Sequence, residues 1–129
     1  MPNKTAIVTG NAPKPAGPYS QGIVANGFLY TAGFGPQDPA TGEMADDVAG
    51  QTAQVLANVA AVLAENGASL DDVVKSTVHL EHSDRDFAAF NEEYAKHFSE
   101  PYPVRTTVQS HLAGILVEID VVAVLPTDR

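Results

Sequence analysis

Short apolar runs and two longer amphipathic segments divide the chain into recognisable elements. Residues 21–25 and 28–32 flank Asn26-Gly27, and both of these turn residues readily adopt positive φ, so the pattern predicts a β-hairpin. A short strand at residues 6–8 comes before a loop rich in glycine and proline, residues 10–18. We therefore expect three strands at the start of the chain.

Apolar residues from Val48 to Leu63 recur every three or four positions, which indicates one packing face of a helix. Asp46 or Asp47 is suited to cap its start, and Asn66-Gly67 stops it after Glu65. The opposite face is polar, and we expect it to be exposed to water. Its residues are Gln51, Gln54, Asn58 and Glu65.

A second amphipathic helix is expected to begin at Ser83-Asp84 and to end at Pro101 and Pro103. Its packing face consists of Phe87, Phe90, Tyr94 and Phe98. A strand over residues 73–80 comes before this helix, and strands at about 105–110 and 116–125 follow it. The order βββ-α-β-α-ββ favours an α+β fold, with a mixed sheet and both helices on one face.

The last strand, residues 115–125, is apolar on both faces apart from Glu118 and Asp120. This pattern is typical of a strand that is buried on both sides. The two helices account for only one side. We therefore expect a second subunit to cover the other side, which makes the protein a homo-oligomer.

Composition narrows the class of protein. The chain has 129 residues, of which 44% are apolar and 18% charged, and this suits one globular domain over residues 1–129. It has no cysteine, which excludes disulfides, thiolate metal sites and a thiol nucleophile. The N-terminus lacks an apolar signal run and no stretch approaches the length of a membrane span, so we expect a cytoplasmic protein.

The charge of the chain limits its partners. Sixteen acidic residues against seven lysines and arginines give a formal net charge of −9, which repels phosphate backbones and anionic lipids. We expect no nucleic-acid partner and no membrane partner. A locally positive pocket around Arg105 is still compatible with a small carboxylate ligand.

Arg105 and Glu118 are charged residues in stretches that otherwise have the pattern of buried strands. A half-buried arginine requires an anionic partner, and its planar fork of donors matches a carboxylate. Either an internal acid, Glu118 or Asp120, or a bound ligand meets this requirement, and the pattern does not decide between them. Glu118 is either such a structural partner or a group that polarises a water molecule beside a bound anion.

Other residues carry weaker signals. Tyr19 follows Gly17-Pro18 in a rigid loop, which suits either a binding residue or a packing anchor. His79 and His82 are expected to turn their rings to opposite faces of a strand end, so no metal site is predicted. Asn91 lies on the polar side of the second helix, where solvation or a local hydrogen bond is expected. The chain has neither a nucleotide-binding fingerprint nor a nucleophile elbow.

Several short segments, in order along nearly the whole chain, carry a family resemblance. They are Ala12-Pro13, Gly17-Pro18-Tyr19-Ser20-Gln21, Pro39-Ala40-Thr41-Gly42, Gln51-Thr52 with Asn58, Val73-Val74-Lys75-Ser76-Thr77-Val78, Phe90-Asn91-Glu92-Glu93-Tyr94, Pro103-Val104-Arg105-Thr106-Thr107-Val108 and Val117-Glu118-Ile119. Together they resemble the RidA (YjgF/YER057c/UK114) family. No one segment is specific, but so many in one order are.

This resemblance implies a chorismate-mutase-like α+β subunit that forms a homotrimer with ligand clefts between neighbouring subunits. It also implies hydrolysis of reactive enamines and imines, such as 2-aminoacrylate or 2-iminobutanoate, to 2-keto acids and ammonia, without a cofactor. In this interpretation Arg105 clamps the substrate carboxylate and Glu118 holds and deprotonates the attacking water. Tyr19 is implied as a third catalytic residue, which lines the cleft with the backbone of Gly33 and Thr107 and orients the imine nitrogen. Asn91 is a further substrate-binding candidate.

Three departures leave the substrate open. Thr107 stands where many members have cysteine, and the loop Ser110–Gly114 is shorter than in the best-studied deaminases. Residues 32–36 replace Ser-Gly-Gln-Ile-Pro with Ala-Gly-Phe-Gly-Pro, which is expected to place the Phe34 ring near the pocket and makes it a substrate-binding candidate. Two functions are therefore carried forward, an imine deaminase and a non-catalytic trimer that binds small carboxylates as a sensor or chaperone-like factor.

Overall fold

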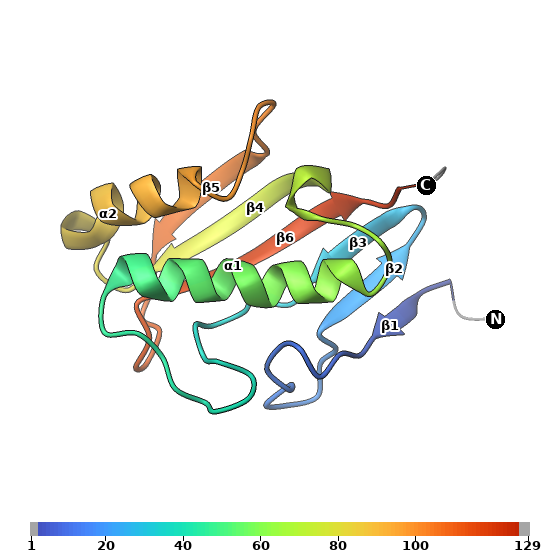
Figure 1. Cartoon of the computed structure of the whole chain (residues 1–129), viewed down its shortest axis with the longest axis horizontal. Coiled ribbons are helices and arrows are strands. Elements are labelled where there is room, and N and C mark those ends of the chain that lie inside the picture. The colour runs from blue at the N-terminus through green and yellow to red at the C-terminus, as the bar shows by residue number, and fades with distance from the viewer. Residues whose placement is uncertain (1–2, 127–129) are drawn as a thin grey trace.

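Two helices pack on one face of a six-stranded sheet (Figure 1). The computed structural model describes residues 3–126. The elements are β1 (Thr5–Ile7), β2 (Gly22–Ala25), β3 (Phe28–Thr31), α1 (Val48–Ala64), the 3-10 helix η1 (Leu70–Asp72), β4 (Val73–Leu80), α2 (Ser83–Ala95), β5 (Val104–Gln109) and β6 (Val117–Val124). The predicted order of strands and helices is confirmed, and η1 is an addition to it.

The sheet is mixed, as predicted, with the strand order β1-β2-β3-β6-β4-β5. Only β4 and β5 are parallel, and α2 is the crossover between them. The predicted hairpin joins β2 to β3 through Asn26 and Gly27, whose φ values are 53° and 80°. This topology places β6 next to β4, with β5 at one edge of the sheet.

The boundaries of α1 agree closely with those expected from its sequence. The Asp47 side chain accepts a hydrogen bond from the Gly50 N–H at 3.0 Å and caps the first turn. Glu65 is the C-cap, and Gly67 follows with a φ of 75°. Valine and leucine side chains of the helix pack on the sheet at near-zero exposure.

The polar face of α1 is not solvated in the way its sequence suggests. Gln51 is only 4% exposed and Asn58 only 1%. The Asn58 amide donates to the carbonyls of Gly35 and Gln37, both at 3.0 Å, and Gln51 accepts from the Leu116 N–H at 2.8 Å. The expectation of exposure is wrong for these two residues because two loops fold over the helix, and their backbone groups need buried partners.

Helix α2 ends at Ala95, earlier than the prolines at 101 and 103 suggest. Phe98 lies beyond the helix and is buried, with its ring stacked on Tyr94 at a centroid distance of 4.4 Å. Phe90 and Tyr94 are also buried, whereas Phe87 is 43% exposed. The predicted packing face of α2 is therefore correct for these three residues and wrong for Phe87.

Strand β6 shows which residues lie on each face of the sheet. Val117, Ile119 and Val121 are buried against the helices, and Glu118 and Asp120 point to the opposite face. We call this opposite face the open face. Its side chains are half-buried or exposed, and the exposed apolar residues on it include Phe28, Tyr30 and Val124. The two-sided burial expected for β6 is not reached within one chain, since both helices lie on the other face (Figure 1).

Neither helix in residues 3–126 has the length and apolar character that a membrane crossing requires.

Candidate functional site

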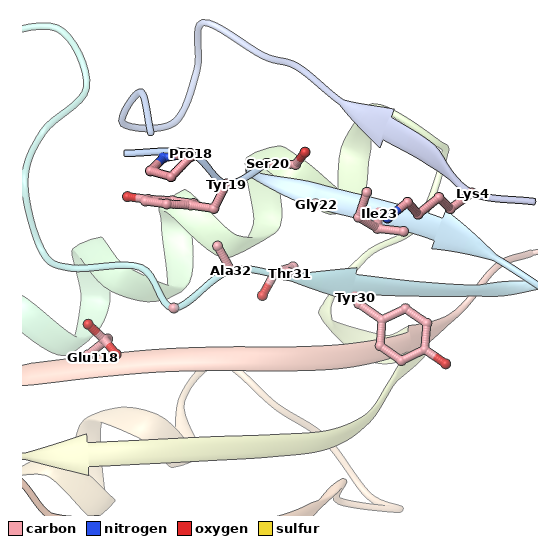
Figure 2. A pocket seen from close by; sticks show the side chains of 11 residues that line it. Lys4, Pro18, Tyr19, Ser20, Gly22, Ile23, Tyr30, Thr31, Ala32 and Glu118 are labelled. Carbon is pink, nitrogen blue, oxygen red and sulfur yellow. The ribbon is translucent and has the colours of Figure 1, made fainter. Parts of the chain in front are cut away.

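Tyr19, Gly33 and Glu118 line one groove of about 690 Å³. The groove is lined by residues of β2 and β3, by the loops next to these strands, and by Glu118 of β6. Figure 2 shows Tyr19, Ala32 and Glu118 at one end of it. Lys4 and Tyr30 lie toward the other end (Figure 2). The structure thus brings together three residues that are up to 99 positions apart in the sequence, counted from Tyr19 to Glu118.

Gly33 lies directly over the Glu118 carboxylate. Phe34 and Ile119 exchange two backbone hydrogen bonds, of 2.9 and 3.2 Å, which pins this segment against β6. A Cβ atom on residue 33 would lie 2.7 Å from Glu118 Oε2. A glycine at this position therefore gives the carboxylate its room and leaves the backbone close to it.

Tyr19 stands in a loop that is fixed by its own hydrogen bonds. Its hydroxyl oxygen accepts from the Ala16 N–H at 3.0 Å, and its side chain is 52% exposed. The buried Gln21 accepts from the Thr9 N–H at 2.8 Å. The Gln21 amide also donates to the carbonyls of Thr9, Ala12 and Pro13. Because its oxygen accepts this bond, the hydroxyl of Tyr19 keeps its own proton available to a ligand.

Phe34 does not line this groove. Its side chain is 5% exposed and belongs to the hydrophobic core. Residues that pair across an antiparallel bridge point to the same face, and Phe34 pairs with Ile119, which faces the helices. The prediction that its ring lies near the pocket is wrong for this reason.

The loop before β6 is held at both ends by buried or partly buried acceptors. The Leu112 N–H donates to Glu81 Oε1 at 2.6 Å, and the Leu116 N–H donates to Gln51. The backbone hydrogen bond from Leu112 is the main cause that lowers the pKa of Glu81 below its ordinary value. These contacts fix the path of the chain two residues before Glu118.

Arg105 lies on the other side of the sheet from Glu118. It is the register partner of Ser76, which is fully buried against the helices, whereas Glu118 is the partner of His79 on the open face. Among residues 3–126, neither Glu118 nor Asp120 forms an ion pair with Arg105. The alternative in which an internal acid neutralises Arg105 is therefore wrong, because the strand pleat turns the two charges to opposite faces.

A second pocket, of about 410 Å³, contains Arg105 and Asn91. Tyr94, Ala95, Tyr102 and Pro103 complete its lining. Thr107 is two residues further along β5 and lines a neighbouring pocket with Phe87. The predicted substrate-binding residues thus divide into two groups, one around Glu118 and one around Arg105.

The guanidinium of Arg105 lies over three aromatic rings of α2. The distances from its central carbon to the ring centroids are 4.8 Å for Tyr94, 5.4 Å for Phe90 and 5.8 Å for Phe87. Burial raises the pKa of Tyr94, and the hydrogen bond to Ser76 and the charge of Arg105 oppose this rise. The charge of Arg105 is therefore balanced by ring faces and not by an acid.

Asp120 and His79 are two further titratable residues on the open face beside Glu118. Burial raises the pKa of Asp120, and the charges of His79 and Lys75 act in the opposite direction. The His79 ring nitrogen Nδ1 lies 2.7 Å from the Ser110 hydroxyl. Within the described part of the chain no three histidine or acidic side chains converge as metal ligands do.

The sequence pattern predicts only a packing position for Tyr94 and gives no specific signal for Tyr102, although both residues line the Arg105 pocket. The one indication in the sequence is that they lie close to Asn91 and Arg105. The contribution of Lys4 and Tyr30 to the first groove had no signal in the sequence, because the sheet order alone brings them there.

The chain is similar to many known proteins and solved structures. The family model described as Endoribonuclease L-PSP matches residues 9–125. A RutC family protein of Pyrococcus horikoshii is 50% identical over 123 residues, which cover 93% of this chain and 97% of that protein. The match therefore spans nearly the full length of both proteins.

One relative and one solved structure carry information on ligands. The 2-iminobutanoate/2-iminopropanoate deaminase of Salmonella typhimurium is 38% identical over 123 residues, covering 92% of this chain and 95% of that enzyme. The crystal structure of E. coli TdcF with bound serine superposes with a TM-score of 0.86 at 35% identity, covering 95% of this chain and 99% of that chain.

Proposed function

The chain belongs to the RidA family, and from this premise we propose that it hydrolyses reactive 2-imino acids and their enamine tautomers to 2-keto acids and ammonia. Short-chain compounds such as 2-iminobutanoate and 2-aminoacrylate are the proposed substrates. The name of the Salmonella relative and the serine bound to TdcF support a small amino-acid-like ligand.

One observation carries the proposal. Arg105 has no acid partner among residues 3–126, and Glu118 stands in a separate groove on the opposite face of the sheet. Each group is half of a site that needs an anion clamp and a water-activating base. We propose that the arginine half of one subunit meets the glutamate half of its neighbour in a homotrimer, which also covers the open face.

The proposed chemistry follows from the residue types. Arg105 binds the substrate carboxylate through two parallel charge-assisted hydrogen bonds, and Asn91 and the backbone of Thr107 complete this half. The substrate reacts as the protonated iminium ion: Glu118 accepts a proton from water as the water oxygen adds to C2, and the C=N electron pair passes to nitrogen to give a neutral carbinolamine. Glu118 then returns its proton to the nitrogen, the C–N bond breaks to release ammonia, and the hydroxyl proton passes through Glu118 to the ammonia as the C=O bond of the 2-keto acid forms.

Tyr19 and Gly33 orient the substrate in the glutamate half. The Tyr19 hydroxyl has a proton to donate toward the substrate nitrogen, and Gly33 lets the substrate approach Glu118 closely. Free imines already hydrolyse in water, so one clamp and one positioned base supply enough acceleration. No cofactor has a part in this scheme.

The description of the matching family model names an endoribonuclease, and the charge of this chain argues against that activity. A net charge of −9 with only seven lysines and arginines opposes contact with an RNA backbone. A small carboxylate substrate is compatible with the same composition, because one arginine suffices to bind it.

The test generates 2-iminobutanoate in situ from threonine with a dehydratase and traps it with semicarbazide. We expect the wild-type protein to suppress trapping, and we expect Arg105→Ala to lower kcat/KM by about 100-fold because it removes both charged hydrogen bonds. Glu118→Gln is the matched variant, which should lower turnover while binding of 2-oxobutanoate persists. Carboxylate binding without any suppression of trapping would instead support the non-catalytic binding protein.

A further inference from the structure

Three aromatic rings of α2 surround the guanidinium of Arg105. Phe87, Phe90 and Tyr94, here called the aromatic cradle, lie along one face of α2, and all three have their centroids within 5.8 Å of the guanidinium carbon. We infer that the cradle is a positioning device for the anion clamp, and that Phe87 and Tyr94 are positioning residues for carboxylate binding by Arg105. This inference rests on the proposed function.

The chemistry of the cradle differs from that of an acid partner. A carboxylate would neutralise the guanidinium and occupy its N–H donors, which would leave fewer for a ligand. A ring face attracts the same cation through its quadrupole and accepts no ordinary hydrogen bond from the donor fork. Within residues 3–126 no hydrogen bond or ion pair uses the Arg105 side chain, so the full fork remains for an incoming anion.

Tyr94 is itself held rigidly. Its hydroxyl lies 2.7 Å from the Ser76 hydroxyl, and both residues are buried. Its ring also packs against Phe90 at 5.4 Å and stacks on Phe98 at 4.4 Å. Since Ser76 is the strand neighbour of Arg105, the same sheet register that places the arginine also anchors the ring beneath it.

Phe87 is the member of the cradle that packing does not explain. It stands on the predicted apolar face of α2, but 43% of its surface remains exposed, so the core gains little from it. It lies 5.8 Å from the guanidinium and also lines the pocket that contains Thr107. A ring at this position lies over the charged end of Arg105, which accounts for a large aromatic residue at an exposed site.

The experiment measures binding of 2-oxobutanoate by isothermal titration calorimetry. Phe87→Leu removes the ring at similar size, and we expect it to weaken binding about fivefold, in line with one partly exposed cation–π contact. Phe87→Tyr restores a ring and should restore the affinity. Tyr94→Phe keeps its ring, loses the link to Ser76, and should weaken binding about twofold.

Two controls separate positioning from general damage. Met44→Leu changes a comparably exposed apolar side chain in the loop before α1, which lies outside the sheet and has no contact with Arg105, and it should leave the affinity unchanged. Thermal unfolding and light scattering of each variant should match the wild-type protein. Equal affinity of Phe87→Leu and the wild type, or an equal loss in Met44→Leu, would overturn the inference.

The outcome is distinguishable from failure of the deaminase proposal. If binding depends on Arg105 and Phe87 but the protein does not suppress semicarbazide trapping, the positioning role of the cradle is supported and the proposed hydrolysis is wrong. If trapping is suppressed while Phe87→Leu binds and turns over normally, the positioning role is wrong and the proposed hydrolysis is supported. If no 2-oxobutanoate binds in an Arg105-dependent manner, the cradle has no anion site to position and the inference fails.

Discussion

Individual residues of the candidate site are explained by which face of a strand they occupy. Glu118 and Arg105 have different surroundings because the pleat of β6 and β5 turns them to opposite sides of the sheet. Glu118 is open to a groove beside Tyr19, whereas Arg105 rests on aromatic rings. The same alternation buries Phe34 in the core, against the expectation from its sequence.

The close approach of Gly33 to Glu118 predicts how a substitution at position 33 affects turnover and stability. In Gly33→Ala the new methyl group would meet Glu118 Oε2 at 2.7 Å, so the carboxylate must rotate away. Because the obstructing atom is the end of a flexible side chain, we expect thermal stability to stay near the wild-type value while turnover falls about tenfold or more. Steady-state kinetics and thermal unfolding on the same preparation check this.

Gly10 is the matched control for that change. A Cβ atom there has no neighbour within 4 Å, so Gly10→Ala should leave both turnover and stability unchanged. A Gly33→Ala variant with wild-type turnover would show that the observed position of the Glu118 carboxylate is not required for the reaction.

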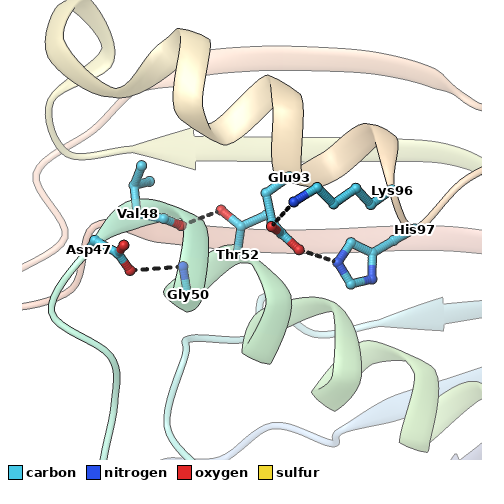
Figure 3. Close-up of polar contacts among 7 residues, drawn as sticks. All are labelled: Asp47, Val48, Gly50, Thr52, Glu93, Lys96 and His97. Carbon is cyan, nitrogen blue, oxygen red and sulfur yellow. Dashed lines mark hydrogen bonds and ion pairs between the residues drawn. The ribbon is translucent and has the colours of Figure 1, made fainter.

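The helices are stabilised by local contacts, and the sequence predicts only some of them. Figure 3 shows the Asp47 cap on α1 and the cluster in which Glu93 of α2 contacts Lys96 and His97. Glu93 lies 2.8 Å from the His97 ring nitrogen Nε2 and 3.3 Å from the Lys96 ammonium. This cluster spans the C-terminal end of α2 and ties its last turn to the following segment.

The Glu93 cluster predicts a pH dependence. The hydrogen bond from His97 is the largest cause that lowers the pKa of Glu93 below its ordinary value of 4.5, with a smaller contribution from Lys96. The unfolded state therefore binds more protons than the folded state in the interval below 4.5. The stabilisation from Glu93 is fully present above that pH and is lost as the pH falls through the folded-state pKa.

Thermal unfolding between pH 3 and 7 tests this dependence. We expect the difference in Tm between the wild type and Glu93→Gln to be largest near pH 6 and to shrink below about pH 4. Glu92→Gln is the control, since Glu92 is exposed and forms no ion pair in the described residues. A difference in Tm that stays constant across this range would contradict the assignment.

In the molecule as a whole, the pockets around Glu118 and Arg105 lie on opposite faces of the sheet. The open face also leaves Phe28, Tyr30 and Val124 exposed, which is unusual for a face that meets only water. Both features suit the proposed assembly, in which a neighbour supplies the missing half and covers this face.

Hybrid oligomers test whether the halves come from different subunits. Arg105→Ala and Glu118→Gln proteins are mixed in equal amounts, unfolded and refolded together. Random assembly would give about a quarter of the sites both intact groups if each site draws on two subunits. We therefore expect the inactive parents to recover roughly a quarter of the wild-type activity, and light scattering to return a trimer.

The matched control refolds each parent alone, which should recover only the low activity of that variant. A mixture no more active than its parents, with hybrid oligomers demonstrated by mass spectrometry, would show that each site lies within one subunit. A monomer in light scattering would remove the proposed cleft altogether.

Local signals in the sequence are sufficient to predict the helices and strands and their order. The Asn26-Gly27 turn, the Asp47 cap and the spacing of valines in α1 are local signals, and the structure confirms each because turn and cap preferences act over a few residues. The motifs also indicated the family and the residue types of a carboxylate-binding site, since those types follow from the chemistry of the ligand.

The direction in which those side chains point, and the residues they contact, depend on the three-dimensional fold. Asn58 and Gln51 belong to a polar stripe in the sequence, but they are buried because distant loops require their amides. Arg105 and Glu118 lie 13 positions apart in the sequence, yet they face opposite sides of the sheet because β4 lies between their strands and sets the register of both. Pairing and register depend on contacts between residues far apart in the chain, and no local pattern specifies them.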